Sequence, residues 1–294
     1  MTNEGATPSN TGRGRTFVIF AVASLIAVAL GAATLAATGH ASGSWLRNPV
    51  AWLVGLVLAL GLTRVRNVSP VSRVILGVAF VAVAATFLAP SQSGVHRWID
   101  AGPLHINIAS LLLPAAIVAL AFCGIWSRTG LAFVAAIAAL LVLQPDASQA
   151  TSFLVAVIIL FAGSTASRAR RIIAVAIAVL VAVISWSRPD PLQPVPEVEG
   201  IFRLALSVSP VLALAAAIAL AATSFSPLCL RNTFDSSRGI AALALTGYFI
   251  SAALCPAFGA FPVPLVGLGM SFPVGSWLGV ALLCANRGEP RDEL

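Results

Sequence analysis

The sequence predicts an all-α protein with a single polytopic membrane domain of about ten transmembrane helices, with eight or nine as the alternative counts. Of the 294 residues, 59% are hydrophobic and only 9% are charged, whereas a soluble domain averages about 25% charged residues. The mean hydropathy is +0.98, and ten apolar runs follow one another along the chain. A globule of this size could not cover so much apolar surface with polar groups, so the composition excludes a soluble enzyme.

The predicted elements begin with a polar segment rich in Gly, Ser, Thr and Asn, which indicates a disordered cytoplasmic tail over 1–15. The apolar run at 17–37 approaches the roughly 20 residues that cross the hydrocarbon core. Because apolar runs continue to the end of the chain, we interpret this run as a retained helix and not as a cleaved signal peptide. The other predicted spans are 50–63, 74–89, 108–126, 131–143, 152–164, 172–186, 201–222, 240–257 and 274–285. The membrane domain thus covers 16–287, and a second cytoplasmic tail covers 288–294.

The arginines indicate the orientation of the chain. If the N-terminus is cytoplasmic, 13 of the 17 arginines fall in cytoplasmic segments and 4 on the opposite side, in agreement with the positive-inside rule. An even number of spans then places both termini in the cytoplasm. The four arginines on the outer side are Arg47, Arg97, Arg188 and Arg203.

The acidic residues indicate where chemistry would occur. With this orientation the extracytoplasmic side holds Asp100, Asp146, Asp190, Glu197 and Glu199. Ionisable groups close to a membrane are costly and tend to mark functional sites. We therefore expect any chemistry at the outer face.

The remaining residue types exclude several kinds of site. The net charge is +7, but the arginines are dispersed between apolar runs and form no contiguous basic footprint, so no nucleic-acid partner is expected. The four cysteines lie far apart without CxxC spacing, and the histidines also lack metal-ligand spacing. This pattern indicates neither a zinc site nor a redox motif.

One segment resembles a known family. Residues 94–103 read G-V-H-R-W-I-D-A-G-P and stand between the third and fourth predicted spans. They resemble the G-x-R-R-W-I-D-L-G-P signature of the shape, elongation, division and sporulation family, the FtsW/RodA type, at seven of ten positions. The family continues with Q-P-S-E-x-x-K, whereas the same places here hold Asn107, Ile108, Ala109, Ser110 and Leu113. The acid and the lysine are missing.

Two further segments are similar to the same family in the same order. Residues 143–146 read L-Q-P-D, like the start of the family's L-Q-P-D-L-G-T. Residues 264–272 read P-L-V-G-L-G-M-S-F and resemble the start of P-x-x-G-x-P-L-P-F-V-S-Y-G-G-S. With the ten spans, the resemblance covers nearly the whole chain.

The resemblance implies an inner-membrane protein of bacterial cell division or cell-shape maintenance that polymerises peptidoglycan glycan strands. It implies a lipid II-like, polyprenyl-diphosphate-linked sugar as substrate and a transpeptidase, a class B penicillin-binding protein, as partner. It also implies a divalent cation, Mg²⁺ or Mn²⁺, at the diphosphate. The residues that it assigns to substrate binding are Arg97, Asp100, Gln144, Asp146 and Arg203.

Glu199 is the candidate catalytic residue, with two interpretations open. Aligning residues 201–202 with the family's P-E-x-H-T-D-F-I-F-A places Glu199 at the catalytic aspartate, in an outer loop that is much shorter here. A carboxylate in a partly apolar cleft can serve as a general base. Alternatively, Glu199 begins a helix, where acids complement the helix dipole, and pairs with Arg203 four residues later.

Arg97 and Asp146 also have alternatives. Arg97 could hold a diphosphate with its planar guanidinium, or pair with Asp100 in an interfacial turn anchored by Trp98. Asp146 could hold a divalent cation or cap the next helix, and we favour the cap.

Two other function classes remain open. One is an inactive scaffold that binds partners of the division or elongation machinery. The other is a lipid or solute transporter, which the near absence of mid-span charges disfavours.

Overall fold

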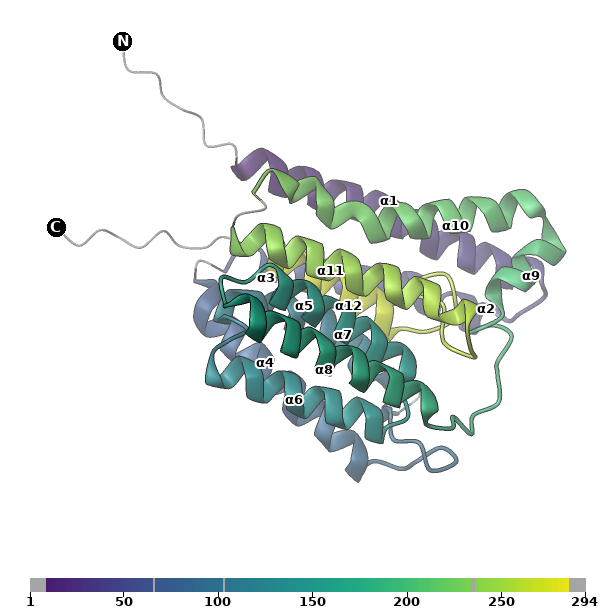
Figure 1. Cartoon of the computed structure of the whole chain (residues 1–294). Helices are drawn as coiled ribbons and strands as arrows, with labels where there is room; N and C mark the ends of the chain where they lie inside the picture. Colours follow the sequence, from purple (N-terminus) through teal and green to yellow (C-terminus); the bar gives the residue numbers. More distant parts are fainter. Residues whose placement is uncertain (1–8, 66, 103, 234–235, 286–294) are drawn as a thin grey trace, which may run out of the picture.

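The structure is a computed structural model and describes residues 9–65, 67–102, 104–233 and 236–285. Within these residues, ten helices of 14 to 29 residues run side by side as one bundle (Figure 1). They are α1 (Ser9–Ala37), α3 (Arg47–Leu62), α4 (Val68–Ala85), α5 (Ile108–Cys123), α6 (Arg128–Leu143), α7 (Ala147–Ala162), α8 (Arg168–Ser187), α10 (Pro210–Phe225), α11 (Ser237–Leu254) and α12 (Ser271–Cys284). The prediction of an all-α polytopic fold with about ten spans is confirmed.

Short elements connect these helices. The helical ones are α2 (Ser42–Trp45), α9 (Ile201–Val208) and the 3-10 helices η1 (Thr86–Leu88), η2 (Ser226–Thr233) and η3 (Cys255–Ala257). Strands β1 (Trp98–Ala101) and β2 (Leu104–Asn107) form an antiparallel hairpin.

Six stretches of the described chain are long and apolar enough to cross a membrane, and α5, α6, α7 and α12 are shorter apolar helices. Helices α5 and α12 pack against each other at the centre of the bundle, and most of their residues are buried. Since neighbouring helices surround them, these two need not match the thickness of the bilayer.

The predicted span at 201–222 is wrong as a single helix. The chain forms the short helix α9, leaves helical geometry at Ser209 (φ −165°, ψ 133°), and starts α10 at Pro210. Proline disfavours the α conformation in the residue before it and suits the first helical position. Ser209 also caps α10 by accepting a hydrogen bond from the N–H of Val211. Figure 1 shows α9 turned away from the direction of α10.

The predicted N-terminal tail is too long, because α1 already begins at Ser9 and not after residue 15. The first turns of α1 pack against η2, where Gly12 approaches the side chain of Leu230, and this contact extends the helix beyond its apolar part. Residues 1–8 of the predicted tail, and the predicted tail at 288–294, lie outside the described residues.

We call the end of the bundle with the β1–β2 hairpin and α9 the outer end, and the opposite end the inner end. The Sγ of Cys284 lies 3.6 Å from the carbonyl oxygen of Arg13, so the first and last described helices share the inner end. The described parts of loops 38–46, 86–107, 188–200 and 255–270 and the turn at 144–146 lie at the outer end. Asn48, near the start of α3, holds the 255–270 loop in place. Its Nδ2 donates to the carbonyls of Leu265 and Gly267, at 3.1 and 2.7 Å.

Glycines on α12 set its close approach to α5. A Cβ on Gly275 would lie 2.2 Å from the carbonyl oxygen of Ser110 and 2.7 Å from that of Leu111, and a Cβ on Gly279 would lie 2.8 Å from the Cβ of Pro114. Small residues allow two membrane helices to pack backbone to backbone in this way.

The orientation of the bundle can be tested by cysteine labelling. Gln193 lies exposed in the outer 188–200 segment, and Arg64 lies exposed at the inner end. In a cysteine-free background, we expect Gln193→Cys to react with an impermeant maleimide in intact spheroplasts and Arg64→Cys to react only after lysis. The reverse pattern would invert the topology and place the candidate site in the cytoplasm.

The α5–α12 contact predicts a stability difference between two glycine substitutions. Gly275→Ala should cost about 1–3 kcal/mol because the backbones must separate. Gly77→Ala, on α4 where a Cβ meets no atom within 4 Å, should be neutral or stabilise by about 0.5–1 kcal/mol. Thermal unfolding of the purified proteins checks both. Equal melting temperatures for the two variants would show that the contact is not tight.

Candidate functional site

The candidate site forms around Arg97, which is only 4% exposed. Its Nε donates to the carbonyl oxygen of Gln144 at 3.3 Å, and its Nη2 donates to that of Pro145. Nη2 also lies 2.6 Å from Oδ2 of Asp190, and Nε lies 3.7 Å from Oδ2 of Asp146. A buried guanidinium requires such partners because an unpaired buried charge is strongly destabilising. We call Arg97, Asp146 and Asp190 the Arg97 cluster.

Asp146 positions α7 as well as Arg97. Its Oδ1 accepts a hydrogen bond from the N–H of Gln149 at 3.1 Å, which makes it the N-cap of α7. The prediction that Asp146 caps the next helix is therefore confirmed. A carboxylate at this end of a helix is also stabilised by the helix dipole, so each oxygen of Asp146 has a structural contact.

Gln144 links the outer ends of α4 and α6. The residue is 1% exposed, and its Nε2 donates to Oγ1 of Thr86 at 2.6 Å and to the carbonyl of Val83 at 3.3 Å. Since the amide points into the protein, Gln144 contributes its main-chain carbonyl to Arg97 and lines neither of the two cavities described below. Its role in substrate binding stays a prediction.

Asp190 is the partner of Arg97 that sequence reasoning missed. It lies in the proline-rich 188–200 segment, where its Oδ1 accepts a hydrogen bond from the N–H of Leu192 at 3.2 Å and its Oδ2 faces Arg97. The charge pattern could have indicated this contact, because a buried arginine needs a carboxylate partner and Asp190 is one of the five acids expected at the outer face.

Glu199 ends a turn directly before α9. Its Oε2 accepts a hydrogen bond from the N–H of Val195 at 2.6 Å. The side chain is half-buried, and the loss of solvation raises its pKa. The hydrogen bond from Val195 acts in the opposite direction, the charge of Asp190 raises the pKa further, and that of Arg97 lowers it. With its raised pKa, the Glu199 carboxylate is a stronger base than a fully solvated glutamate.

Two ion pairs that the sequence left open as alternatives do not form among the described residues. Asp100 does not pair with Arg97; it is exposed on β1 and pairs with Nδ1 of His105 on β2, because alternate strand residues face opposite sides. Glu199 does not pair with Arg203 in the described structure: Arg203 is exposed on α9, and Glu199 folds back to Val195 instead. The structure therefore does not bring Asp100 or Arg203 into the Arg97 cluster.

Two adjoining spaces give the site its shape. A cavity of about 320 Å³ opens at the outer end, and a recess of about 40 Å³ lies against the Arg97 cluster. Trp98, Ser110 and Glu199 line both of them. Glu199 therefore lies between the open cavity and the charged cluster, where a bound group would reach both.

Arg47 is a second residue that sequence reasoning missed as part of the site. It is exposed, lines the larger cavity, and donates from Nε to the carbonyl of Gly43 at 3.1 Å. Unlike Arg97, it has no carboxylate partner among the described residues. Arg47 lies outside every segment that resembles the family, so its expected place at the outer face was the one signal in the sequence.

The Arg97 cluster does not fit a resident divalent cation. Among the described residues, no three His, Cys, Asp or Glu side chains gather closely enough to hold a metal ion. Asp146 and Asp190 already face a guanidinium, and Mg²⁺ takes nearly all its ligands from oxygens in octahedral geometry. These residues therefore do not form a site for the Mg²⁺ or Mn²⁺ that the resemblance implies.

The Arg97 cluster predicts unequal effects of removing outer-face carboxylates. Breaking one partner of a buried ion pair costs roughly 3–5 kcal/mol, so Asp190→Asn should lower stability by an amount at the low end of that range, since Asp190 retains 21% side-chain exposure. The matched control is Asp100→Asn, whose ion pair is exposed and should be worth less than about 1 kcal/mol. Melting temperature in detergent measures both.

Arg97→Lys separates a structural from a substrate-binding role. Lysine keeps the charge but not the planar fork, so we expect abundance and melting temperature to fall together with any activity. Full abundance with lost substrate affinity would instead mean that Arg97 holds the diphosphate.

Comparisons with known proteins place this arrangement in a known fold. No family model matches the chain, and no curated protein matches it. Among solved structures, the rod shape determining protein RodA of Thermus thermophilus matches with a TM-score of 0.65 and 18% identity, over 90% of this chain and 94% of that chain. An aspartate-to-alanine variant of it matches with a TM-score of 0.66 and 18% identity, over 90% and 95%.

A third solved structure, described as the structural coordination of polymerization and crosslinking by a peptidoglycan synthase complex, matches with a TM-score of 0.62 and 22% identity, over 90% of this chain and 95% of that chain. These identities are low, but the similarity spans nearly the whole of each chain. The chain is a multi-pass membrane protein with a RodA/FtsW-type fold.

Proposed function

We propose that this chain is a RodA/FtsW-like protein of the bacterial inner membrane that acts in cell division or cell-shape maintenance as a peptidoglycan glycosyltransferase. The observation that carries the proposal is the position of Glu199. In a RodA-type fold, its half-buried carboxyl, whose pKa is raised by lost solvation, lines a cavity of about 320 Å³ at the end of the bundle expected to be outer.

The chemistry is glycosyl transfer from a lipid II-like, polyprenyl-diphosphate-linked sugar. The acceptor hydroxyl gives its proton to the Glu199 carboxylate while its oxygen forms a bond to the anomeric carbon. The bond from that carbon to the diphosphate oxygen breaks, and the polyprenyl diphosphate leaves with the electron pair. A base with a raised pKa accepts such a proton more readily than an ordinary glutamate.

Within the cavity, Arg47 is the cation best placed to hold the diphosphate, because Nε alone is committed to Gly43 and its terminal nitrogens can form the bidentate contacts that suit phosphate. Arg97 acts indirectly, by fixing Asp190 and thereby the segment that leads to Glu199. We also propose a transpeptidase partner, a class B penicillin-binding protein, since one of the similar structures is described as a synthase complex that couples polymerization with crosslinking.

A scaffold without catalysis is the second candidate, and specific positions favour it. Ser110 and Leu113 stand where the family has an acid and a lysine. The N–H of Ser110 is used by the Asn107 cap at 2.9 Å, and Leu113 is fully buried in the core. Neither side chain carries the charge that the family's acid or lysine would have at that position.

An assay of glycan polymerisation on purified protein with lipid II, with and without a transpeptidase, distinguishes the two candidates. Glu199→Gln keeps size and hydrogen bonding but cannot accept a proton, so activity should fall roughly 10²–10⁴-fold. Glu199→Asp should be milder because it retains the carboxylate. Activity of the wild type should be lost as pH falls through the raised pKa of Glu199, because only the deprotonated form is a base.

Glu197→Gln is the matched control. Glu197 lies two residues away and pairs with Nε2 of His40 at 2.8 Å, a contact that glutamine can preserve as a hydrogen bond, so activity should change less than a few-fold. Wild-type polymerisation by Glu199→Gln would remove Glu199 from the mechanism. No polymerisation by any form, together with growth complementation by Glu199→Gln, would establish the scaffold.

A further inference from the structure

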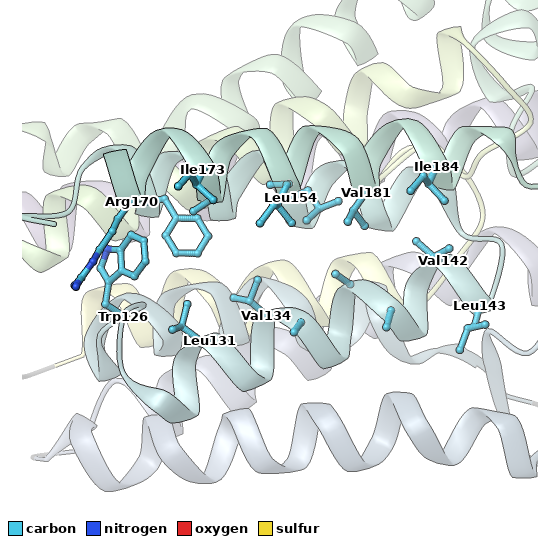
Figure 2. A pocket seen from close by; sticks show the side chains of 17 residues that line it. Trp126, Leu131, Val134, Val142, Leu143, Leu154, Arg170, Ile173, Val181 and Ile184 are labelled. Carbon is cyan, nitrogen blue, oxygen red and sulfur yellow. The ribbon is translucent and has the colours of Figure 1, made fainter. Parts of the chain in front are cut away.

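An apolar groove of about 800 Å³ runs along the bundle between α6 and α8, with α7 as its floor (Figure 2). Its walls are aliphatic side chains such as Val134 and Ala139 of α6 and Val181 of α8. From Leu131 to Leu143 the groove follows about 18 Å of α6, at 1.5 Å per residue, which approaches the length of one fatty-acyl chain.

The two ends of the groove differ in chemistry. Figure 2 shows Trp126 and Arg170 at one end and Leu143 and Ile184 at the other. The first pair belongs to the inner end of the bundle, where α8 begins. Trp126 donates from Nε1 to Oγ of Ser164 at 2.7 Å. Tryptophan and arginine together are typical of headgroup depth in a membrane.

The charge at this end has no counterpart in the described protein. All five acidic side chains that the structure describes lie at the outer end. Arg171 donates to the carbonyl of Ala162 at 2.9 Å, but Arg170 is exposed, is the one charged residue in the lining of the groove, and pairs with no described carboxylate. The groove therefore combines a long hydrocarbon wall with one cation at its inner end.

We propose that this groove binds an anionic phospholipid of the inner leaflet, with its phosphate on Arg170 and an acyl chain between α6 and α8. Basic pockets between membrane helices at the cytoplasmic side suit such headgroups. The polyprenyl diphosphate of the proposed function fits less well, because its charged group belongs at the outer end, where Leu143 and Ile184 line the groove.

The bound lipid would support the outer site through α8. Only Ala178 and Ser185 of this helix are buried, so α8 rests mainly on α7 and leaves the groove open beside it. The chain leads from α8 directly into the 188–200 segment with Asp190 and Glu199. A lipid that fills the groove gives α8 a second packing partner and steadies the start of that segment.

Native mass spectrometry of the delipidated full-length protein in detergent tests the proposal, with dioleoyl phosphatidylglycerol and dioleoyl phosphatidylcholine as probes. We expect one phosphatidylglycerol to bind at least tenfold more tightly than phosphatidylcholine and to raise the melting temperature. Arg170→Gln should weaken phosphatidylglycerol binding about tenfold, as expected for a lost charge-assisted hydrogen bond, whereas Arg64→Gln, at the inner end but outside the groove, should not.

Filling the groove supplies a test that is independent of charge. Ala139→Trp should abolish the bound lipid, while Ala132→Trp, on an exposed face of α6 outside the groove, should retain it. Equal binding of the two phospholipids by the wild type would overturn the proposal even if variants fold poorly. Displacement of phosphatidylglycerol by an equal concentration of a polyprenyl diphosphate would also overturn it and assign the groove to the substrate tail. Neither result depends on whether Glu199 is catalytic.

Discussion

The outer end of this protein depends on the need to neutralise one buried guanidinium. Arg97 donates hydrogen bonds to the carbonyls of the α6–α7 turn. Its guanidinium also faces Asp146, the cap of α7, and Asp190 of the 188–200 segment. These groups lie 47 to 93 residues after Arg97 in the chain. A single buried charge therefore fixes three outer segments relative to one another. These contacts also help to position the hairpin that follows Arg97 and the turn that carries Glu199.

The same cluster also shapes the chemistry that the site can perform. Two carboxylates face one guanidinium in the cluster, and lost solvation, more than the opposing charges of Asp190 and Arg97, raises the pKa of the neighbouring Glu199. Carboxylates beside the cavity also repel a diphosphate. The proposed function therefore assigns the base to Glu199 and a separate cation to Arg47, both of which line the cavity.

The fold could be predicted from sequence because its signal is local: apolar runs long enough to span, separated by polar residues. One exception, the break before Pro210, is also local, but the apolar run continues across this proline, so the hydropathy pattern alone does not show the break. The site was harder, because its contacts are not local. The sequence offered Asp100 as an alternative partner of Arg97 and Arg203 as one of Glu199, both near neighbours, whereas Arg97 pairs with Asp190, 93 residues away. Asp146 was predicted correctly as a cap because a cap depends only on the next three residues.

The central place of α12 has a consequence for how the chain is made. This helix is the last one described, yet it lies against α3 and α5, and nearly all its residues are buried. Synthesis delivers the chain from its N-terminus, so α3 and α5 enter the bilayer long before the helix that packs between them. Until then the surface of α5 that contacts Gly275 and Gly279 of α12 faces lipid or another protein. The described bundle can reach its native packing only after α12 has been synthesised, and a chain arrested before that point lacks the centre of its own core.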